Sequence, residues 1–123
     1  MLAHVSIGVS DVKKAGAFYD SVLGPLGYKR VYDSEGALAY GEKDAVLWLL
    51  ASGGTVKPDT RSGLHFCFDA KARADVDAFH AAGLKNGGTD NGKPGVRKDY
   101  SPNYYAAFVV DPDGYRLEAY CGK

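Results

Sequence analysis

The stretch His4-Val5-Ser6-Ile7-Gly8-Val9 decides the fold, because a similar stretch, His65-Phe66-Cys67-Phe68, returns in the second half of the chain. Both alternate between polar and apolar residues, which is typical of a β-strand with one buried face. Each is followed by an aspartate, Asp11 or Asp69, a residue type that often caps a helix. The sequence therefore predicts the same strand-to-helix unit twice.

The segments that follow keep the same offset. Residues 17–19 correspond to residues 78–80, and both lie in stretches with the apolar spacing of an amphipathic helix. Gly24 and Gly83 predict the ends of these helices, since glycine is favoured just after a helix.

Three short strand candidates follow each helix. They are residues 28–32, 37–40 and 45–50 in the first half, and 96–100, 104–110 and 115–120 in the second. Asp111-Pro112-Asp113-Gly114 predicts a tight turn between the last two strands. Residues 52–61 have no periodic pattern and are interpreted as a linker. We therefore predict an α+β fold with a single domain over residues 1–123, made of two βαβββ modules at about 1–51 and 62–123.

Bulk composition excludes several classes of partner. The 15 basic residues balance the 15 acidic ones, so charge gives no reason to expect nucleic acid. Apolar runs are too short to cross a membrane, and the start lacks the pattern of a signal peptide, so the cytoplasm is the expected location. Cys67 and Cys121 are interpreted as small half-buried thiols, although Cys121 lies close enough to Glu118 in sequence to be a site neighbour.

Two of the three histidines open the matched strands. Alternation places His4 and His65 on the strand faces opposite their aliphatic neighbours, and it places Glu118 opposite Leu117 and Ala119. Two imidazoles and one carboxylate form a set that holds a divalent metal and leaves positions open for substrate. Taken singly, each residue is more simply explained as a hydrogen-bonded strand residue. The matched positions of the histidines favour a common site.

These strands, together with the segment Asp111-Pro112-Asp113-Gly114-Tyr115-Arg116-Leu117-Glu118, resemble the vicinal oxygen chelate superfamily, which includes the glyoxalases, bleomycin resistance proteins and dioxygenases. The resemblance covers essentially the whole chain. It implies a glyoxalase-like half-barrel of mixed sheets with a U-shaped cleft, and a divalent iron, manganese, zinc or nickel ion bound by His4, His65 and Glu118. It also implies a homodimer, in which the two modules around one site come from one chain or from two.

Two positions depart from named relatives. Trp48 stands where glyoxalase I has a fourth, glutamate ligand, and Phe108 stands where the fosfomycin-resistance transferases have a tyrosine. Indole does not ligate metals, so glyoxalase activity is disfavoured. A lyase, a dioxygenase and a thiol transferase remain open as reaction types.

Further candidates for contact with a small-molecule ligand are Trp48, Arg97, Tyr100, Tyr104 and Tyr105. The last four lie in a glycine- and tyrosine-rich segment, residues 92–105, that is suited to closing over an anionic or oxygenated ligand. For each tyrosine taken individually, sheet packing is the favoured interpretation. His80, on the second helix, is interpreted as a packing or surface residue.

The leading hypothesis is a metal-dependent enzyme acting on a small oxygen-chelating substrate, with its catalytic acid or base unidentified. The alternative is a non-catalytic binding protein of the bleomycin-resistance type, which needs no metal and uses Trp48 and the tyrosines as stacking surface. Metal content discriminates between the two.

Overall fold

The computed structural model describes residues 1–54 and 59–123, and it contains the predicted unit twice. The first module comprises β1 (Val5–Val9), α1 (Val12–Leu23), a short 3₁₀ turn (Gly24–Leu26), β2 (Lys29–Asp33), β3 (Ala37–Gly41) and β4 (Leu47–Ala51). The second comprises β5 (Phe66–Asp69), α2 (Arg73–Lys85), β6 (Thr89–Val96), β7 (Tyr105–Val110) and β8 (Arg116–Cys121). The predicted α+β fold of two βαβββ modules is confirmed. Part of the expected linker, residues 55–58, lies outside the described residues.

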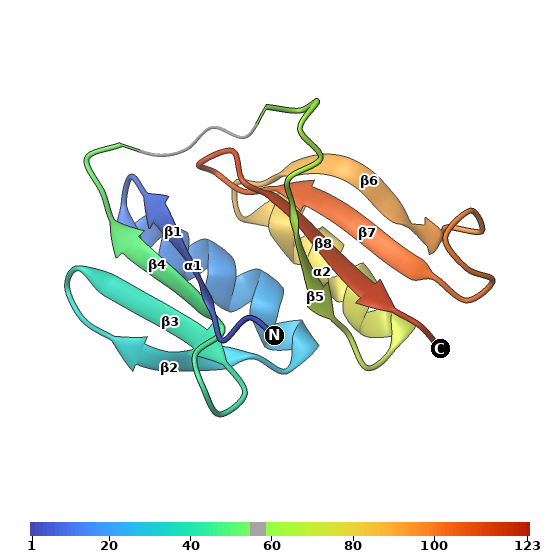
Figure 1. The fold of residues 1–123 in the computed structure, drawn as a ribbon, viewed down its shortest axis with the longest axis horizontal. Coiled ribbons are helices and arrows are strands. Elements are labelled where there is room, and N and C mark those ends of the chain that lie inside the picture. Colours follow the sequence, from blue (N-terminus) through green and yellow to red (C-terminus); the bar gives the residue numbers. More distant parts are fainter. Residues whose placement is uncertain (55–58) are drawn as a thin grey trace.

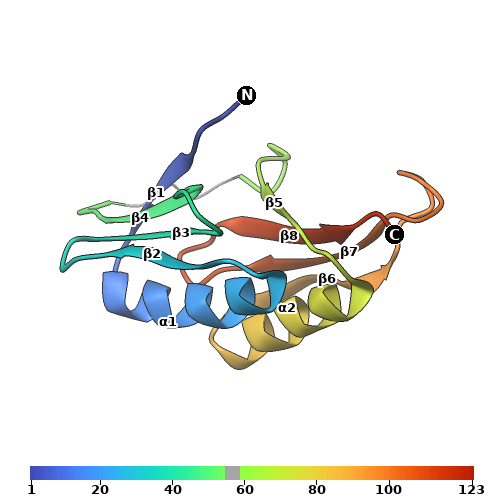
Figure 2. The ribbon, with the colours of Figure 1, turned by 90° about the horizontal axis from the view of Figure 1, so that it is seen from below.

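Each module contributes one four-stranded mixed sheet. Sheet A has the order β1-β4-β3-β2, and sheet B has the equivalent order β5-β8-β7-β6. The first and last strands of each module pair in parallel, while the other neighbours are antiparallel. Figures 1 and 2 show the two sheets on one side of the molecule and α1 and α2 next to each other on the other side.

Strand alternation and helix amphipathicity create the core between these layers. Ile7 and Val9 on β1 are buried, whereas Ser6, whose side chain points to the other face of the strand, is exposed. Phe18, with the other buried side chains of α1, packs into the same cluster as the apolar residues of β5, β7 and β8. Because both modules share this core, the faces turned away from the helices are left to carry polar and aromatic side chains.

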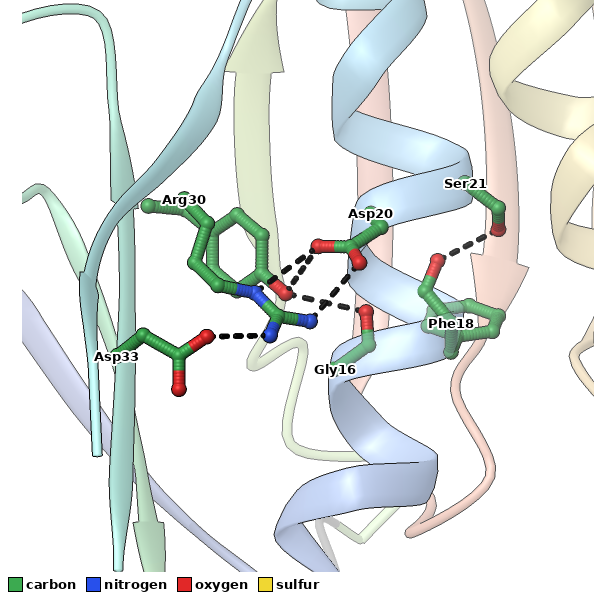
Figure 3. A network of polar contacts seen from close by, with 7 residues as sticks. Gly16, Phe18, Asp20, Ser21, Arg30 and Asp33 are labelled. Carbon is green, nitrogen blue, oxygen red and sulfur yellow. Dashed lines mark hydrogen bonds and ion pairs between the residues drawn. The ribbon is translucent and has the colours of Figure 1, made fainter. Parts of the chain in front are cut away.

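A polar network fixes the β2–β3 hairpin to α1 (Figure 3). The Arg30 guanidinium donates two hydrogen bonds to Asp20 and one to Asp33, and Tyr40 donates to Asp20 at 2.7 Å. Gly16 allows this approach, since a Cβ there would lie 2.7 Å from Arg30 Nη2. The network therefore depends on a glycine in the middle of a helix, where glycine is otherwise unfavourable.

The Asp111-Pro112-Asp113-Gly114 turn ties the two modules together. The buried Asp111 carboxylate accepts from the Tyr115 backbone N–H at 2.8 Å and from the Tyr19 hydroxyl of α1 at 2.5 Å. The Tyr115 hydroxyl donates in turn to the Gly8 carbonyl of β1 at 2.7 Å. Two side chains near one turn thus reach both the first strand and the first helix of the other module.

Two local predictions are wrong. The segment 96–100 was expected to be a strand, but β6 occupies Thr89–Val96 and a turn follows it. β6 is glycine-rich and lacks alternation, so its extended form comes from pairing with β7 rather than from its own pattern.

Of the two predicted helix ends, the one at Gly24 is confirmed and the one at Gly83 is wrong. α1 gives way to a 3₁₀ turn at Gly24, and the left-handed residue is Gly27, with φ 90°. α2 continues through Gly83, whose missing Cβ makes room for Val109, and the left-handed residue after it is Gly87. A left-handed glycine follows each helix, whereas Gly83 lies inside α2 and is explained by its close packing against Val109.

Candidate functional site

Strand register on sheet B gathers a row of side chains on the face turned away from α2, which we call the open face. Glu118 on β8 lies opposite Cys67 of β5 and Phe108 of β7. Laterally paired residues point to the same side of a sheet, so these three side chains share the open face, while Leu117 and Ala119 enter the core. Glu118 is only 3% exposed, which is unusual for an acidic residue.

Glu118 is held by two neighbours. One oxygen, Oε1, lies 2.9 Å from His65 Nε2, and the other, Oε2, accepts a hydrogen bond from the Tyr104 hydroxyl at 2.6 Å. The second imidazole nitrogen, Nδ1, lies 2.9 Å from the Gly63 carbonyl oxygen. Both His65 nitrogens therefore face oxygen acceptors.

A neutral imidazole has only one N–H and satisfies only one such acceptor. With the proton on Nε2, the imidazole donates a hydrogen bond to the Glu118 carboxylate; with the proton on Nδ1, it donates to Gly63 and the Nε2 lone pair points at the carboxylate. The second arrangement is favourable only with a cation, such as a metal ion, between Nε2 and the carboxylate. The 2.9 Å separation also matches the roughly 3.0 Å between adjacent ligand atoms at right angles on an ion with bonds of about 2.1 Å. The pair thus fits two positions of a metal site.

Tyr104 supports the carboxylate from the loop before β7. Desolvation is the largest cause that raises the pKa of the Tyr104 phenol well above its ordinary value, and the hydrogen bond to Glu118 is the next. The hydroxyl therefore stays a proton donor. Its ring lies 4.2 Å from that of Tyr120 and makes an edge contact with Tyr100 at 5.0 Å. Aromatic packing therefore fixes the hydroxyl that orients Glu118.

Cys67 is the site neighbour that the sequence interpretation did not single out. Desolvation and the adjacent Glu118 charge raise the pKa of its thiol to about 12. The group is a thiol at neutral pH, which makes it a weak nucleophile. Cys121, the cysteine expected near the site, is instead buried in the core on the opposite face of β8. The two-residue spacing between His65 and Cys67, which puts both side chains on the same face of a strand, is the feature of the sequence that could have identified Cys67.

Sheet A repeats the register with different chemistry. Trp48 of β4 lies opposite Ser6 of β1, as Glu118 lies opposite Cys67. The His4 ring meets the Trp48 ring edge-on at 6.4 Å between centroids, and Tyr32 lies 5.1 Å from the same indole. His4 thus adjoins an aromatic surface where His65 adjoins a carboxylate.

Of the three expected ligands, His65 and Glu118 are brought together within one chain. His4 lies on sheet A, and across residues 1–54 and 59–123 no group of three or more histidine, cysteine or acidic side chains is arranged to hold a metal ion.

The remaining candidates separate between the two faces of sheet B. Arg97 lies on the open face, over the Phe108 ring at 5.5 Å, and Tyr100 is 65% exposed beside Tyr104. Tyr105 turns the other way, since its hydroxyl donates to Asp77 of α2 at 2.6 Å. The structure therefore brings Arg97, Tyr100 and Tyr104 to the open face and places Tyr105 on the helix side.

His80 has a packing role, as expected. It is 8% exposed on α2, and its Nε2 lies 2.8 Å from Asp90 Oδ1 on β6. This contact joins a helix to the strand beside it, away from the His65–Glu118 pair.

A cavity of about 480 Å³ lies between β1 and β5, the end strands of the two sheets that face each other in Figure 1. His65 and Cys67 line it from sheet B, and Val5 and Leu47 line it from sheet A. Its volume is in the range of small-molecule sites. The candidate site is therefore next to the junction of the modules.

Paired βαβββ modules with an imidazole and a buried carboxylate on one open face define a class of small α+β proteins with a site beside the module junction. The model of the Glyoxalase/Bleomycin resistance protein/Dioxygenase superfamily matches residues 1–119. The chain belongs to this superfamily, which confirms the resemblance seen in the sequence.

Solved structures agree. A glyoxalase/bleomycin resistance protein from Albidiferax ferrireducens T118 is 31% identical, with 98% of each chain covered and a TM-score of 0.86. Two structures share the fold at lower identity. A glyoxalase-related enzyme from Fulvimarina pelagi is 18% identical, covering 98% of this chain and 87% of its own, with a TM-score of 0.74. A genomically encoded fosfomycin resistance protein from Listeria monocytogenes is 15% identical, covering 100% and 93%, with a TM-score of 0.71.

None of the curated proteins compared matches the chain. Within the described residues, neither α1 nor α2 is long and apolar enough to cross a membrane.

Proposed function

We propose that this protein is a metal-dependent enzyme of the superfamily acting on a small substrate with adjacent oxygen atoms. His65 and Glu118 would hold a divalent ion together with His4 of a second copy. The observation that carries the proposal is the 2.9 Å contact between His65 Nε2 and a carboxylate that is 3% exposed. The contact places an imidazole and a carboxylate, two ligand types for a divalent metal, side by side.

The second copy supplies what one chain lacks. His4 heads β1 as His65 heads β5, but it adjoins Trp48 instead of a carboxylate. β1 and β5 are end strands beside the cavity, so both are placed for contact with another chain. We therefore include a homodimer with two equivalent sites in the proposal. A cytoplasmic location also belongs to it, in keeping with the unpaired Cys67 and Cys121.

When bound, a divalent ion would polarise substrate oxygens as a Lewis acid. The chain's own residues would bind and orient. Tyr104 donates to Glu118 Oε2 and so fixes the carboxylate, while Trp48 and Tyr100 offer aromatic surface to the substrate. The fold is compatible with a lyase, a dioxygenase and a thiol transferase alike, and the proposal does not choose among them.

Metal content tests the proposal. Protein purified without chelators or an affinity tag is expected to contain about one divalent ion per chain by plasma mass spectrometry. Glu118→Gln and His4→Ala should each lose it, while Glu42→Gln, which alters an exposed carboxylate paired with Lys71, should retain it. Metal retained at full occupancy by Glu118→Gln would overturn the assignment.

A mixing experiment tests the shared site. His4→Ala chains and Glu118→Gln chains, unfolded together and refolded, would form mixed dimers in which one site keeps all three ligands. Metal binding should therefore return in the mixture although each variant alone lacks it. A mixture that stays metal-free would indicate that all three ligands act within one chain.

One observation favours a second function, that of a non-catalytic binding protein. With the N–H of the neutral imidazole on Nε2, both Glu118 oxygens accept hydrogen bonds, from His65 and from Tyr104, without any ion, and aromatic rings lie in both halves of the site. On this hypothesis the wild type takes up no iron, manganese, nickel or zinc on incubation. Such a result would replace the enzyme proposal with the binding one.

A further inference from the structure

Arg97 occupies a prepared position on the open face of sheet B. Its guanidinium lies over the Phe108 ring, 5.5 Å from Cζ to the ring centroid. Nη1 donates to the Gly95 carbonyl at 2.9 Å, and Nη2 donates to the Lys93 carbonyl at 2.7 Å. A stacked guanidinium held by two backbone acceptors has a fixed orientation, and three of its five N–H groups remain for a ligand.

Missing side chains on β6 make room for this arrangement. A Cβ on Gly92 would lie 3.3 Å from Arg97 Nη2 and 2.9 Å from Phe108 Cδ2, and one on Gly95 would lie 3.2 Å from Nη1. A side chain at either position would crowd the guanidinium and force it to shift by a few tenths of an ångström. The glycines that made this segment hard to recognise as a strand are therefore the ones that accommodate Arg97.

Arg97 also lacks an acidic partner. Arg30 pairs with two aspartates and Arg61 pairs with Asp59, but no ion pair to Arg97 exists in the described part of the chain. The four residues outside that part carry no acidic side chain. An oriented, unpaired guanidinium on a face that also bears a cation-binding pair attracts an anion.

Phe108 connects this cation to the His65–Glu118 pair. The His65 ring lies 6.2 Å from the Phe108 ring on one side, and Arg97 lies 5.5 Å from it on another. Phe108 also pairs directly with Glu118 in the strand ladder. Phe108 is therefore the ring that both the Arg97 guanidinium and the His65 imidazole contact.

We infer that the substrate is a small anion, and that Arg97 binds its carboxylate or phosphonate group while its other oxygens meet the His65–Glu118 pair. This inference rests on the proposed function for the second half of the contact. Arg97 is a specificity residue: it selects for negative charge at one end of the substrate and takes no part in bond breaking.

Binding of simple anions tests this directly. Methylphosphonate, acetate and the uncharged acetamide are titrated into metal-loaded protein and followed by amide chemical shifts. The wild type should bind at least one anion and should not bind acetamide, and Arg97→Gln should weaken the anion at least about tenfold. Arg97→Lys keeps the positive charge but loses the planar guanidinium with its paired N–H groups, so its anion affinity should lie between those of Arg97→Gln and the wild type.

Arg73 offers a matched control. It lies over the ring of Tyr105, 5.1 Å from Cζ to the centroid, on the helix side of the same strand β7. Arg73→Gln therefore removes an arginine stacked on an aromatic ring without touching the open face. Equal weakening by Arg73→Gln and Arg97→Gln, or no anion binding by the wild type, would overturn the inference.

The two proposals fail separately. Arg97→Gln should keep its metal. If the metal-loaded variant binds anions as tightly as the wild type does, only the Arg97 inference is overturned. A wild type without metal that still binds anions through Arg97 would remove the metal proposal and leave the anion contact standing.

Discussion

The two modules share a backbone plan and differ in what it carries. In each, the first strand pairs in parallel with the last, and the matched positions are Ser6 and Trp48 in sheet A and Cys67 and Glu118 in sheet B. An indole lies beside His4, and a buried carboxylate lies beside His65. Repetition of the fold thus preserves register, while chemistry depends on single residues at equivalent positions.

The turn before the last strand shows the same contrast and gives the largest expected effect. In the second module this turn contains Asp111, which is buried and accepts from Tyr19 of the other module. In the first module the equivalent turn contains Asp44, which is exposed. Asp111→Ala should lower the free energy of unfolding by about 3 kcal/mol, because several buried donors lose their acceptor.

Urea unfolding measures this difference. Asp44→Ala is the matched control and should change stability by less than about 0.5 kcal/mol. Similar losses for the two variants would mean that the turn of the second module does not fasten the modules together.

The second-largest effect is expected on metal affinity, from a substitution that makes the first module resemble the second. Trp48→Glu places a carboxylate beside His4, as Glu118 stands beside His65. If His4 contributes to the metal site, the variant should bind metal at least about tenfold more tightly, since it adds a ligand. Isothermal titration with zinc, against Trp48→Gln as control, measures the change. Unchanged affinity in Trp48→Glu would separate His4 from the site.

The support of Glu118 distinguishes two neighbouring tyrosines. Tyr104 donates to Glu118 on the open face, and Tyr105 donates to Asp77 on the helix side. Tyr104→Phe should weaken metal binding by about tenfold, since residues that hold a metal ligand affect affinity on this scale. Tyr105→Phe should leave metal affinity unchanged while losing a hydrogen bond of its own. Equal effects would contradict the assignment of faces.

These tyrosines also show where sequence reasoning stops. Alternation and the repeated offset predicted most strands to within two residues, because half-buried strands must alternate. Neighbours such as Tyr104 and Tyr105 fall on opposite faces, so a shift of one residue in the strand boundary exchanges their roles. The extended form of β6 (Thr89–Val96) comes from pairing with β7 and leaves no mark in its own composition.

The His65–Glu118 pair was predicted as part of a site from the repeat and the resemblance. Its direct contact depends on the parallel register of β5 with β8, which the sequence does not specify. The placement of Arg97 over Phe108 depends further on glycines that looked only like loop residues. Local pattern thus identifies the strands, and tertiary pairing determines which residues meet.

The smallest expected effect compares the thiol environments of the two modules. The pKa of Cys67 is raised to about 12, first by desolvation and then by the Glu118 charge. Because alkylation requires the thiolate, its rate with iodoacetamide in metal-free protein should keep rising with pH up to about 11 instead of levelling near 9. Glu118→Gln removes the charge but leaves the burial, so it should raise the alkylation rate at pH 8.5 only a few-fold, because desolvation is the larger cause of the raised pKa.

Ser6→Cys, made in a Cys67→Ala background, is the matched thiol in the first module. It would face Trp48 without a nearby carboxylate, so its alkylation should level off at a lower pH than that of Cys67. Identical pH profiles for the two thiols would mean that the Glu118 carboxylate contributes no measurable charge to the open face. The metal proposal would then lose its electrostatic basis, since a carboxylate that does not repel a thiolate has no negative charge to offer a cation.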